Sequence, residues 1–323
     1  MLFTYKRKIL ALVLALLLAL VFITACTGTF AKGDQEKLTV NFIDVGFGDA
    51  TLISLPDGKT MLIDTGANTS SNKDKVSETV EKYTKRIDYL VLTNLNNEHI
   101  SNAINIVETF EIDKAFLPYV ADKTPFITFK NIYDALLERE VAIQYSKSFT
   151  DLSTLDYTLV FLSPNASGVD GDYNKFNYSE IKTQSLINNL SPIIYLEFCG
   201  VKFVFSSDSE ISQENWVVES YKGGLYDTFG QNGHALSLED IDFYKLSNHG
   251  GDVGNSSEFL SLLKPKNAII SVGGANNLGY PSTSVLTSLT SVNPDHKLYR
   301  TDMDKTVRVE VNNFGKYQIY KGE

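Results

Sequence analysis

Histidine and cysteine are scarce in this chain of 323 residues, which has four histidines and two cysteines. Two cysteines cannot build a disulfide framework, so an apolar core has to stabilise the fold. Basic runs are also missing apart from residues 6–8, and the formal net charge is −10. This charge argues against a broad surface that follows phosphates, although it leaves a local basic groove open. Gly-rich phosphate-binding motifs of the GxGxxG or GKT/GKS type do not occur.

Apolar residues, in contrast, are plentiful. They make up 43% of the chain, and aromatic residues make up 11%. This composition predicts a globular protein with a sizeable core, in one large domain or two modest ones. Cys199 lies in the apolar run IIYLEFCGVKFVF, and we expect it to be buried and structural.

The N-terminus carries a targeting signal. The basic stretch MLFTYKRK precedes an apolar run from Ile9 to Ile23, and the sequence then reads Thr-Ala-Cys. The run resembles a bacterial signal peptide with a lipobox, which predicts a signal peptide over 1–25, lipidation of Cys26 and a linker over 26–37. An uncleaved membrane anchor is the alternative, although a run of 15 residues is short for one. Both interpretations place the remaining chain at the cell membrane, facing the extracytoplasmic side.

The rest of the chain alternates between strand and helix patterns. Alternating or fully apolar runs predict strands at 38–43, 50–55, 60–63, 87–94, 114–117, 142–145, 192–198, 201–205, 242–246 and 267–272, followed by a terminal hairpin. Helical patterns occur at 72–85, 99–110, 129–139, after Asp208, at 256–263 and at 283–288. The polar stretch 146–190 is expected to be a surface excursion. Strands joined by helices, twice over, predict an α/β fold with two packed sheets.

Three polar clusters follow apolar strands at the points where those strands end. They are TNLNNEHIS at 93–101, FSSDSE with Asp208, and KLSNHGGDVGNSS with His249. Glutamate, aspartate and histidine are ligands for zinc or manganese, and strand ends can converge on one site. Each cluster alone has a simpler explanation, since Asp208 could cap a helix and His249 could lie in a turn.

Taken together, the clusters resemble the metallo-β-lactamase domain of the DNA-uptake competence (ComEC) family. VNFIDVGFGDATLISLPDGKTMLIDTG is similar to the family opening, F-x-D-V-G-Q-G-D followed by L-I-D-T-G. Later matches keep the family order and end in LYRTDMDKTVRVEV; they are Asn188-Asn189-Leu190-Ser191, Ser206-Ser207-Asp208, Asn248-His249-Gly250 and Gly279-Tyr280-Pro281. The resemblance implies a four-layer αββα metallo-β-lactamase sandwich over residues 38–323.

The chain departs from the family at the metal motif T-H-x-D-x-D-H-x-G-G. Asn94 and Asn96 replace a histidine and an aspartate, Glu98 replaces an aspartate, and His99 is kept. Tyr280 replaces the histidine of the G-H-P motif, and Asn248-His249 replaces a histidine pair. The first position of that pair, Asn248, is favoured as the ligand place, with His249 as the alternative. Neutral asparagine is a poor zinc ligand and brings no charge to offset a dication. The first metal set is therefore predicted to be degenerate.

Two hypotheses follow for function. The first is a lipid-anchored protein that is non-catalytic or strongly impaired and serves in binding of nucleic acid, a cell-wall polymer or an unknown protein partner. The second is a single-metal hydrolase, with phosphodiesters implied as substrates by the resemblance. One zinc or manganese ion would lie on Glu98, His99, Asp208 and His249, with Glu98 or Asp208 as the base. Asp64 and Asp44 are expected to orient the ligands. His234 and His296 fall outside every motif and are expected in loops.

Overall fold

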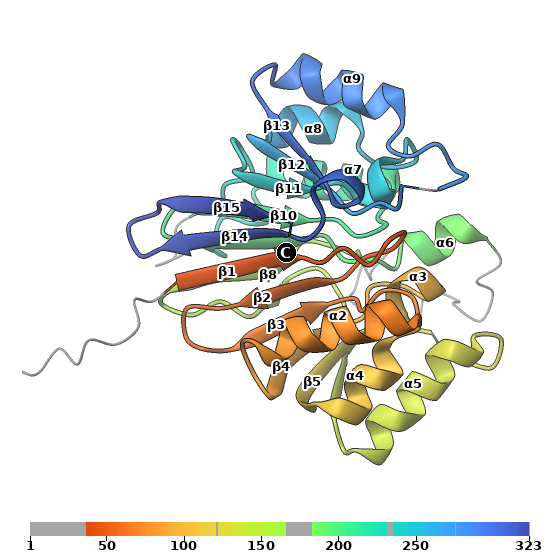
Figure 1. Ribbon diagram of the computed structural model, residues 1–323. Coiled ribbons are helices and arrows are strands. Elements are labelled where there is room, and N and C mark those ends of the chain that lie inside the picture. The colour runs from red at the N-terminus through yellow and green to blue at the C-terminus, as the bar shows by residue number, and fades with distance from the viewer. Residues whose placement is uncertain (1–36, 121, 166–182, 231–234, 275, 323) are drawn as a thin grey trace, which may run out of the picture. The chain divides into compact units, whose positions relative to one another are not determined.

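The computed structural model describes residues 37–120, 122–165, 183–230, 235–274 and 276–322 (Figure 1). The predicted signal peptide, Cys26, residues 26–36 of the linker and His234 lie outside these residues. The chain from Lys37 onward forms one compact unit. None of the helices in the described ranges is long and apolar enough to cross a membrane.

The first sheet has eight strands in the order β15-β14-β1-β2-β3-β4-β5-β6. β1 pairs antiparallel with β2 and β14, whereas β3 to β6 run parallel. The strands are β1 (Lys37–Phe42), β2 (Thr51–Ser54), β3 (Thr60–Ile63), β4 (Arg86–Val91), β5 (Glu111–Leu117), β6 (Ala142–Tyr145), β14 (Val307–Asn312) and β15 (Tyr317–Lys321).

The second sheet has seven strands in the order β13-β12-β11-β10-β9-β8-β7. β10 to β13 run parallel, whereas the pairs β7–β8, β8–β9 and β9–β10 are antiparallel. The strands are β7 (Thr150–Asp151), β8 (Tyr157–Phe161), β9 (Ile194–Phe198), β10 (Val201–Phe205), β11 (Phe243–Lys245), β12 (Asn267–Ile270) and β13 (Lys297–Arg300).

Helices cover the outer face of each sheet, so that the apolar core has three layers (Figure 1). One layer lies between the first sheet and α2 (Ser70–Glu81), α4 (Ala103–Thr109) and α5 (Ile127–Glu138). The middle layer lies between the two sheets and is rich in phenylalanine and valine. The third lies under α7 (Ile211–Lys222), α8 (Ser257–Leu263) and α9 (Thr283–Val292). This is a four-layer αββα sandwich, and the predicted fold class is confirmed.

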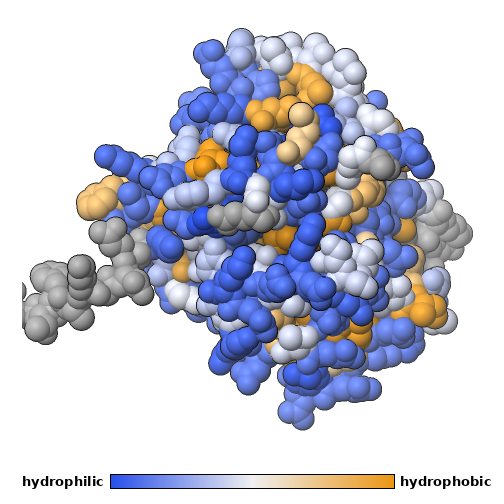
Figure 2. Space-filling model, in the orientation of Figure 1, coloured by the Kyte–Doolittle hydropathy of each residue, from blue (hydrophilic) through white to orange (hydrophobic). Residues whose placement is uncertain are grey.

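The outer surface is polar, as expected for the solvent side of such a sandwich. Figure 2 shows a largely hydrophilic face with apolar side chains in scattered patches.

Short elements complete the fold: α3 (Asn97–Ile100), α6 (Gln184–Asn188), the 3-10 helix η4 (Ser247–Gly250) and α10 (Thr301–Asp304).

The predicted helix over 99–110 is instead two helices, α3 and α4. The break falls at Asn102, whose backbone N–H donates to the carbonyl of Gly66, outside both helices, at 3.2 Å. The Asn102 side chain also donates to the carbonyl of Thr65 at 3.1 Å. These bonds attach the segment that follows β3 to the segment that follows β4.

Two other expectations were wrong. The stretch 146–190 is not wholly a surface excursion, because β8 (Tyr157–Phe161) is fully buried between β7 and β9. Its five residues, YTLVF, are apolar apart from the hydroxyl groups of Tyr157 and Thr158. The polar segments on both sides make this short strand hard to recognise in the sequence. Cys199 is exposed rather than buried, because it forms with Gly200 the two-residue turn between β9 and β10, both at positive φ.

Candidate metal centre

The functional residues gather where strands of both sheets end. Asp64 follows β3, the segment 93–99 follows β4, Asp208 follows β10 and His249 follows β11. β3 is parallel to β4, and β10 is parallel to β11, so within each pair the carboxyl ends lie at the same edge. Ligand sites of α/β sheets form at such edges.

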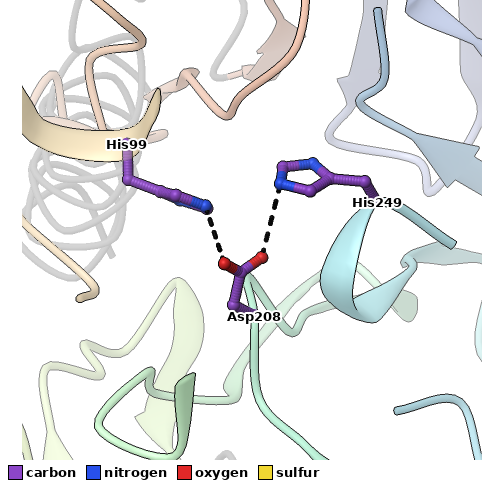
Figure 3. Close-up of side chains that lie close together, drawn as sticks. All are labelled: His99, Asp208 and His249. Carbon is purple, nitrogen blue, oxygen red and sulfur yellow. Dashed lines mark ion pairs between the residues drawn. The ribbon is translucent and has the colours of Figure 1, made fainter. Parts of the chain in front are cut away.

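Three buried side chains converge at this edge (Figure 3). His99 Nε2 lies 2.9 Å from Asp208 Oδ2, and His249 Nε2 lies 3.5 Å from Asp208 Oδ1. The two imidazole rings lie 5.3 Å apart, centroid to centroid. All three side chains are at most 4% exposed. The sequence predicted these three residues as ligands, and the fold brings them together from positions up to 150 residues apart.

The atoms at the centre of this group lack hydrogen-bond partners. His99 Nε2, His249 Nε2 and Asp208 Oδ1 are buried without a hydrogen bond, although His99 Nε2 forms an ion pair at 2.9 Å with Oδ2, the other oxygen of the Asp208 carboxylate. Buried polar atoms are almost always hydrogen-bonded, so orphans that face one point call for an explanation. A divalent ion would satisfy all of them, because two imidazoles and one carboxylate form a ligand set typical of catalytic zinc sites with an open position. The residues present therefore fit one metal ion.

The far nitrogens of both imidazoles are fixed by hydrogen bonds. His99 Nδ1 lies 2.8 Å from Asp64 Oδ2, and His249 Nδ1 lies 2.8 Å from the carbonyl oxygen of Ser271. Such partners set the tautomer and turn the Nε2 atoms toward the centre. Asp64 also accepts hydrogen bonds from the N–H and hydroxyl of Thr93 at 2.8 and 2.6 Å, and it is fully buried.

His249 lies in a strained turn. Asn248 and His249 have φ of 48° and 52°, and Gly250 follows with φ of 81°. Non-glycine residues in the left-handed region cost about 1–2 kcal/mol each, and such strain is concentrated at functional sites. Of the pair whose ligand place the sequence left open, His249 faces Asp208, whereas Asn248 joins the turn to the Asp208 loop through its N–H, 2.8 Å from the carbonyl of Ser207.

The asparagines of the degenerate motif belong to an amide network. Asn94 Nδ2 lies 3.2 Å from Asp208 Oδ2, and Asn94 Oδ1 accepts from the N–H of Asn96 at 2.9 Å. The Asn96 side chain reaches Asn188 Oδ1 at 3.5 Å, and Asn188 in turn donates to Glu210 at 2.9 Å. The amide of Asn94 thus donates to the carboxylate that lies between His99 and His249.

The remaining predicted positions lie outside the central group. Among the described residues, the sets of ligand atoms within 4.8 Å of one another include His99, Asp208 and His249 but not Glu98. Asp44 accepts from the N–H of Gly46 at 3.2 Å and pairs with Lys75 at 3.4 Å, so it organises the loop after β1. Tyr280 packs its ring over Gly251, in the loop that follows His249.

Sequence reasoning missed a buried ion pair beneath the imidazoles. Lys245 at the end of β11 pairs with Asp49, and both side chains are at most 4% exposed. Asp49 Oδ1 lies 3.6 Å from His249 Nδ1, and Asp49 Oδ2 lies 3.8 Å from His99 Nδ1. The only signal in the sequence is a lysine that ends an apolar strand, because Asp49 lies in the glycine-containing stretch IDVGFGDA, which has the composition of an ordinary turn.

The Asp49 loop is wedged between both halves of the site. A side chain at Gly48, whose φ is 140°, would collide with the carbonyl oxygen of Glu98 at 2.2 Å. One at Gly273 would meet the backbone nitrogen of Phe47 at 2.6 Å. The Phe47 ring lies 4.5 Å from that of His249, centroid to centroid. Close backbone approach therefore explains these glycines.

Burial and opposite charges shift the acid–base behaviour of the centre. Burial lowers the pKa of His99, but the carboxylates of Asp208 and Asp64 outweigh it and raise that pKa well above its usual value. Burial raises the pKa of Asp208, but His99 and His249 outweigh it and hold that pKa far below its usual range. The pKa of Asp49 is lowered in the same way, mainly by Lys245 against the effect of burial. The centre is thus a compact group of opposite charges.

Comparisons with known proteins agree with this fold. No family model matches the chain. The chain is 24% identical over 300 residues to "ComE operon protein 3" of Bacillus subtilis (strain 168). The aligned region covers 87% of this chain and 34% of that protein. The chain therefore spans about a third of the length of this curated relative.

Among solved structures, one aligns well enough to support the fold. The CmlA beta-hydroxylase E377D mutant aligns with a TM-score of 0.51 and 11% identity over 85% of this chain and 54% of that chain. Igni18, titled a metallo hydrolase from Ignicoccus hospitalis, covers 84% of this chain and 98% of its own length at 14% identity and a TM-score of 0.46. The similarity to metallo-β-lactamase-fold proteins of the ComEC type, predicted from the sequence, is confirmed.

Proposed function

We propose that this protein is a lipid-anchored extracytoplasmic relative of the ComEC-type metallo-β-lactamase domain that holds one divalent metal ion and serves mainly in binding. The observation that carries the proposal is the convergence of three buried ligand atoms without hydrogen-bond partners, on His99, Asp208 and His249. Zinc or manganese suits a set of two imidazoles and one carboxylate.

When bound, such an ion supplies Lewis acidity and lowers the pKa of a coordinated water. The residues of the chain prepare the place for it. Asp64 holds His99 Nδ1, and the Ser271 carbonyl holds His249 Nδ1, so both Nε2 atoms face the centre. Lys245 neutralises Asp49 below them, which limits the negative charge left for the ion to offset.

Two-metal chemistry is not supported by this arrangement. Cleavage by two metals needs both ions to clamp the attacking and leaving oxygens. Asn94 instead donates an amide hydrogen to Asp208 Oδ2, and Asn96 bonds to Asn188. Amides that are already hydrogen-bonded add no charge and would have to break these bonds to reach an ion. Hydrolysis is therefore expected to be absent or strongly impaired.

The charges around the centre favour an uncharged ligand over a polyanion. Burial raises the pKa of Tyr280, and the charged groups that raise it further are the carboxylates of Asp252, Asp208 and Glu210. Nucleic acid would need lysine and arginine in their place. The glycan strands of a cell wall, which are rich in hydroxyl and amide groups and carry no phosphate, suit the neighbouring amides better. Cosedimentation of the protein with purified cell wall tests this choice. Loss of that cosedimentation when single-stranded DNA is added would argue against it.

A single-metal phosphodiesterase is the second candidate. It is favoured by the open position that three protein ligands leave on a tetrahedral ion. Asp208, or Glu98 if its carboxylate turns toward the centre, would then serve as the base.

Metal analysis of the full chain tests the proposal. We expect about one zinc or manganese ion per chain, lost in His99→Ala and in Asp208→Ala. His296→Ala is the matched control, since His296 lies outside the centre and bonds the carbonyl of Asn293 at 2.8 Å. Metal-dependent turnover of bis-p-nitrophenyl phosphate would establish the hydrolase in place of the binding protein. Two ions per chain, or none, would contradict a single-metal centre.

A further inference from the structure

The turn that presents His249 cannot hold its shape by local preference. Asn248, His249 and Gly250 all have positive φ, and two of the three carry side chains. Such a run persists only where the surrounding structure over-determines it. The contacts that hold the ends of this turn therefore decide where the His249 imidazole points.

Both ends of the turn are held by one side chain, that of Asn255. Asn255 Nδ2 donates to the carbonyl oxygens of Ser247 and Gly251, each at 2.9 Å. Asn255 Oδ1 accepts from the N–H of Ser247 and the hydroxyl of Tyr244, each at 3.0 Å. Two donors and two acceptor sites are all that a carboxamide offers, so the group is fully satisfied and its orientation is fixed.

Asn255 is in turn fixed by Glu214, a completely buried residue of α7. The Glu214 carboxylate accepts the N–H of Asn255 at 2.5 Å and the N–H of Ser256 at 2.7 Å. The same helix begins three residues after Asp208, and its first N–H, that of Ile211, donates to the carbonyl of Val253 at 3.0 Å. The chain thus ties the loop of His249 to the helix that follows Asp208.

We infer that Asn255, fixed by Glu214, is the positioning residue that aims His249 at the metal centre. The inference rests on the proposed function for its metal, but not for the placement of the imidazole. Ser256 caps α8 by accepting the N–H of Phe259, whereas Asn255, one residue earlier, closes the turn that presents His249. If Asn255 served only to stabilise the fold, its replacement would leave the orientation of the His249 imidazole unchanged.

The test compares two buried asparagines in the full chain, purified in detergent. Asn255→Asp keeps size but places an oxygen against the carbonyls of Ser247 and Gly251. Asn267→Asp is the matched control, since Asn267 is buried in β12 and donates to the carbonyl of Asp242 at 2.9 Å, outside the centre. Four histidines give a simple NMR spectrum of imidazole Cε1–H groups, in which His249→Gln assigns the His249 signal.

We expect Asn255→Asp to shift the His249 signal in zinc-free protein and to weaken zinc binding at least tenfold in a chelator competition. Asn267→Asp should leave that signal in place and zinc affinity within about twofold of the parent. An unchanged His249 signal in Asn255→Asp, or an equal shift in Asn267→Asp, would overturn the inference.

Two further outcomes are decided by the same measurements. If Asn255→Asp does not fold, Glu214→Gln takes its place in the test. The new amide group would turn a donor toward the N–H of Ser256 or of Asn255 and so disturb the anchor of Asn255. A shifted His249 signal in this variant supports the inference, and an unchanged one overturns it. If the parent protein binds no zinc, the proposed metal fails, whereas the zinc-free His249 signal still decides whether Asn255 positions the ring.

Discussion

At the scale of single residues, the centre is a carboxylate between two imidazoles, with hydrogen-bonded amides beside it. The amide of Asn94 donates to Asp208, and that of Asn96 donates to Asn188. Burial disfavours the protonated form of His99, but the carboxylates of Asp208 and Asp64 outweigh it and raise the pKa of His99 well above its usual value. Acid–base behaviour is therefore the most direct property of the metal-free centre.

The metal-free protein should be most stable between about pH 4 and 6.5. The pKa of His99 is raised well above 6.5 on folding, so its contribution is complete below 6.5 and is lost as pH rises through the folded pKa. The pKa of Asp208 is lowered from 3.8, so its contribution is present above 3.8 and is lost as pH falls through the folded pKa. Urea unfolding in EDTA should show a free energy that declines from pH 6.5 upward.

The matched variant for this pH profile is Asp208→Asn, which removes the largest attractive charge acting on His99. It should flatten the decline above pH 6.5, because the pKa of His99 then shifts less on folding. A parent free energy that rises between pH 6.5 and 8.5, or an equal slope in the variant, would contradict this account.

How far sequence predicts a site depends on how far apart its partners lie. His99, Asp208 and His249 each sit in a local motif after a strand, and the resemblance to one family ordered them. Lys245 and Asp49 carry no such signal, because they are 196 positions apart and neither has a motif that requires the other. Asn255 escaped for a different reason: its side chain makes four hydrogen bonds to the nearby residues Tyr244, Ser247 and Gly251, but only the positive-φ turn at 248–250 brings them around it.

At the scale of elements, periodicity predicted the strands with clear boundaries and failed where flanks were misleading. β8 is flanked by polar segments, and its burial comes from its neighbours β7 and β9 rather than from its own pattern. The start of α2 moved for a local reason, since the Thr69 hydroxyl accepts the N–H of Asn72 and caps the helix earlier than the apolar spacing suggested. Tertiary contacts set the burial of β8, and a local cap sets the start of α2.

The assignment of β8 to the central layer predicts a contrast between two leucines. Leu159 is fully buried between the sheets, so Leu159→Ala should cost about 2–5 kcal/mol in the free energy of unfolding. Leu155, only four positions away, is 88% exposed, and Leu155→Ala should change it by about 0.5 kcal/mol or less. Chemical denaturation of both variants measures the contrast, and equal losses would show that 150–161 is no part of the core.

At the scale of the whole molecule, the fold could be predicted because many weak signals agree. Alternating strands, interleaved helices and ordered motifs all required two packed sheets, and the three apolar layers supply that packing. The metal content could not be predicted from the same signals, since it depends on where individual imidazole nitrogens point. Position in the cell depends on neither, and rests on the segment 1–26.

The two cysteines of the chain allow a sharp test of the predicted anchor. If Cys26 is lipidated, Cys26→Ala should abolish labelling by radioactive palmitate and shift the protein from the detergent phase to the aqueous phase or leave it unprocessed. Cys199→Ala is the matched control, because Cys199 is exposed at a turn of the folded domain and should keep full labelling. Multiple acyl chains hold a protein firmly, whereas a single chain does not, so the partition should be nearly complete. Labelling that survives Cys26→Ala, or that Cys199→Ala removes, would place the lipid at another residue. If the parent chain carries no label but still sediments with membranes, the uncleaved anchor is established instead.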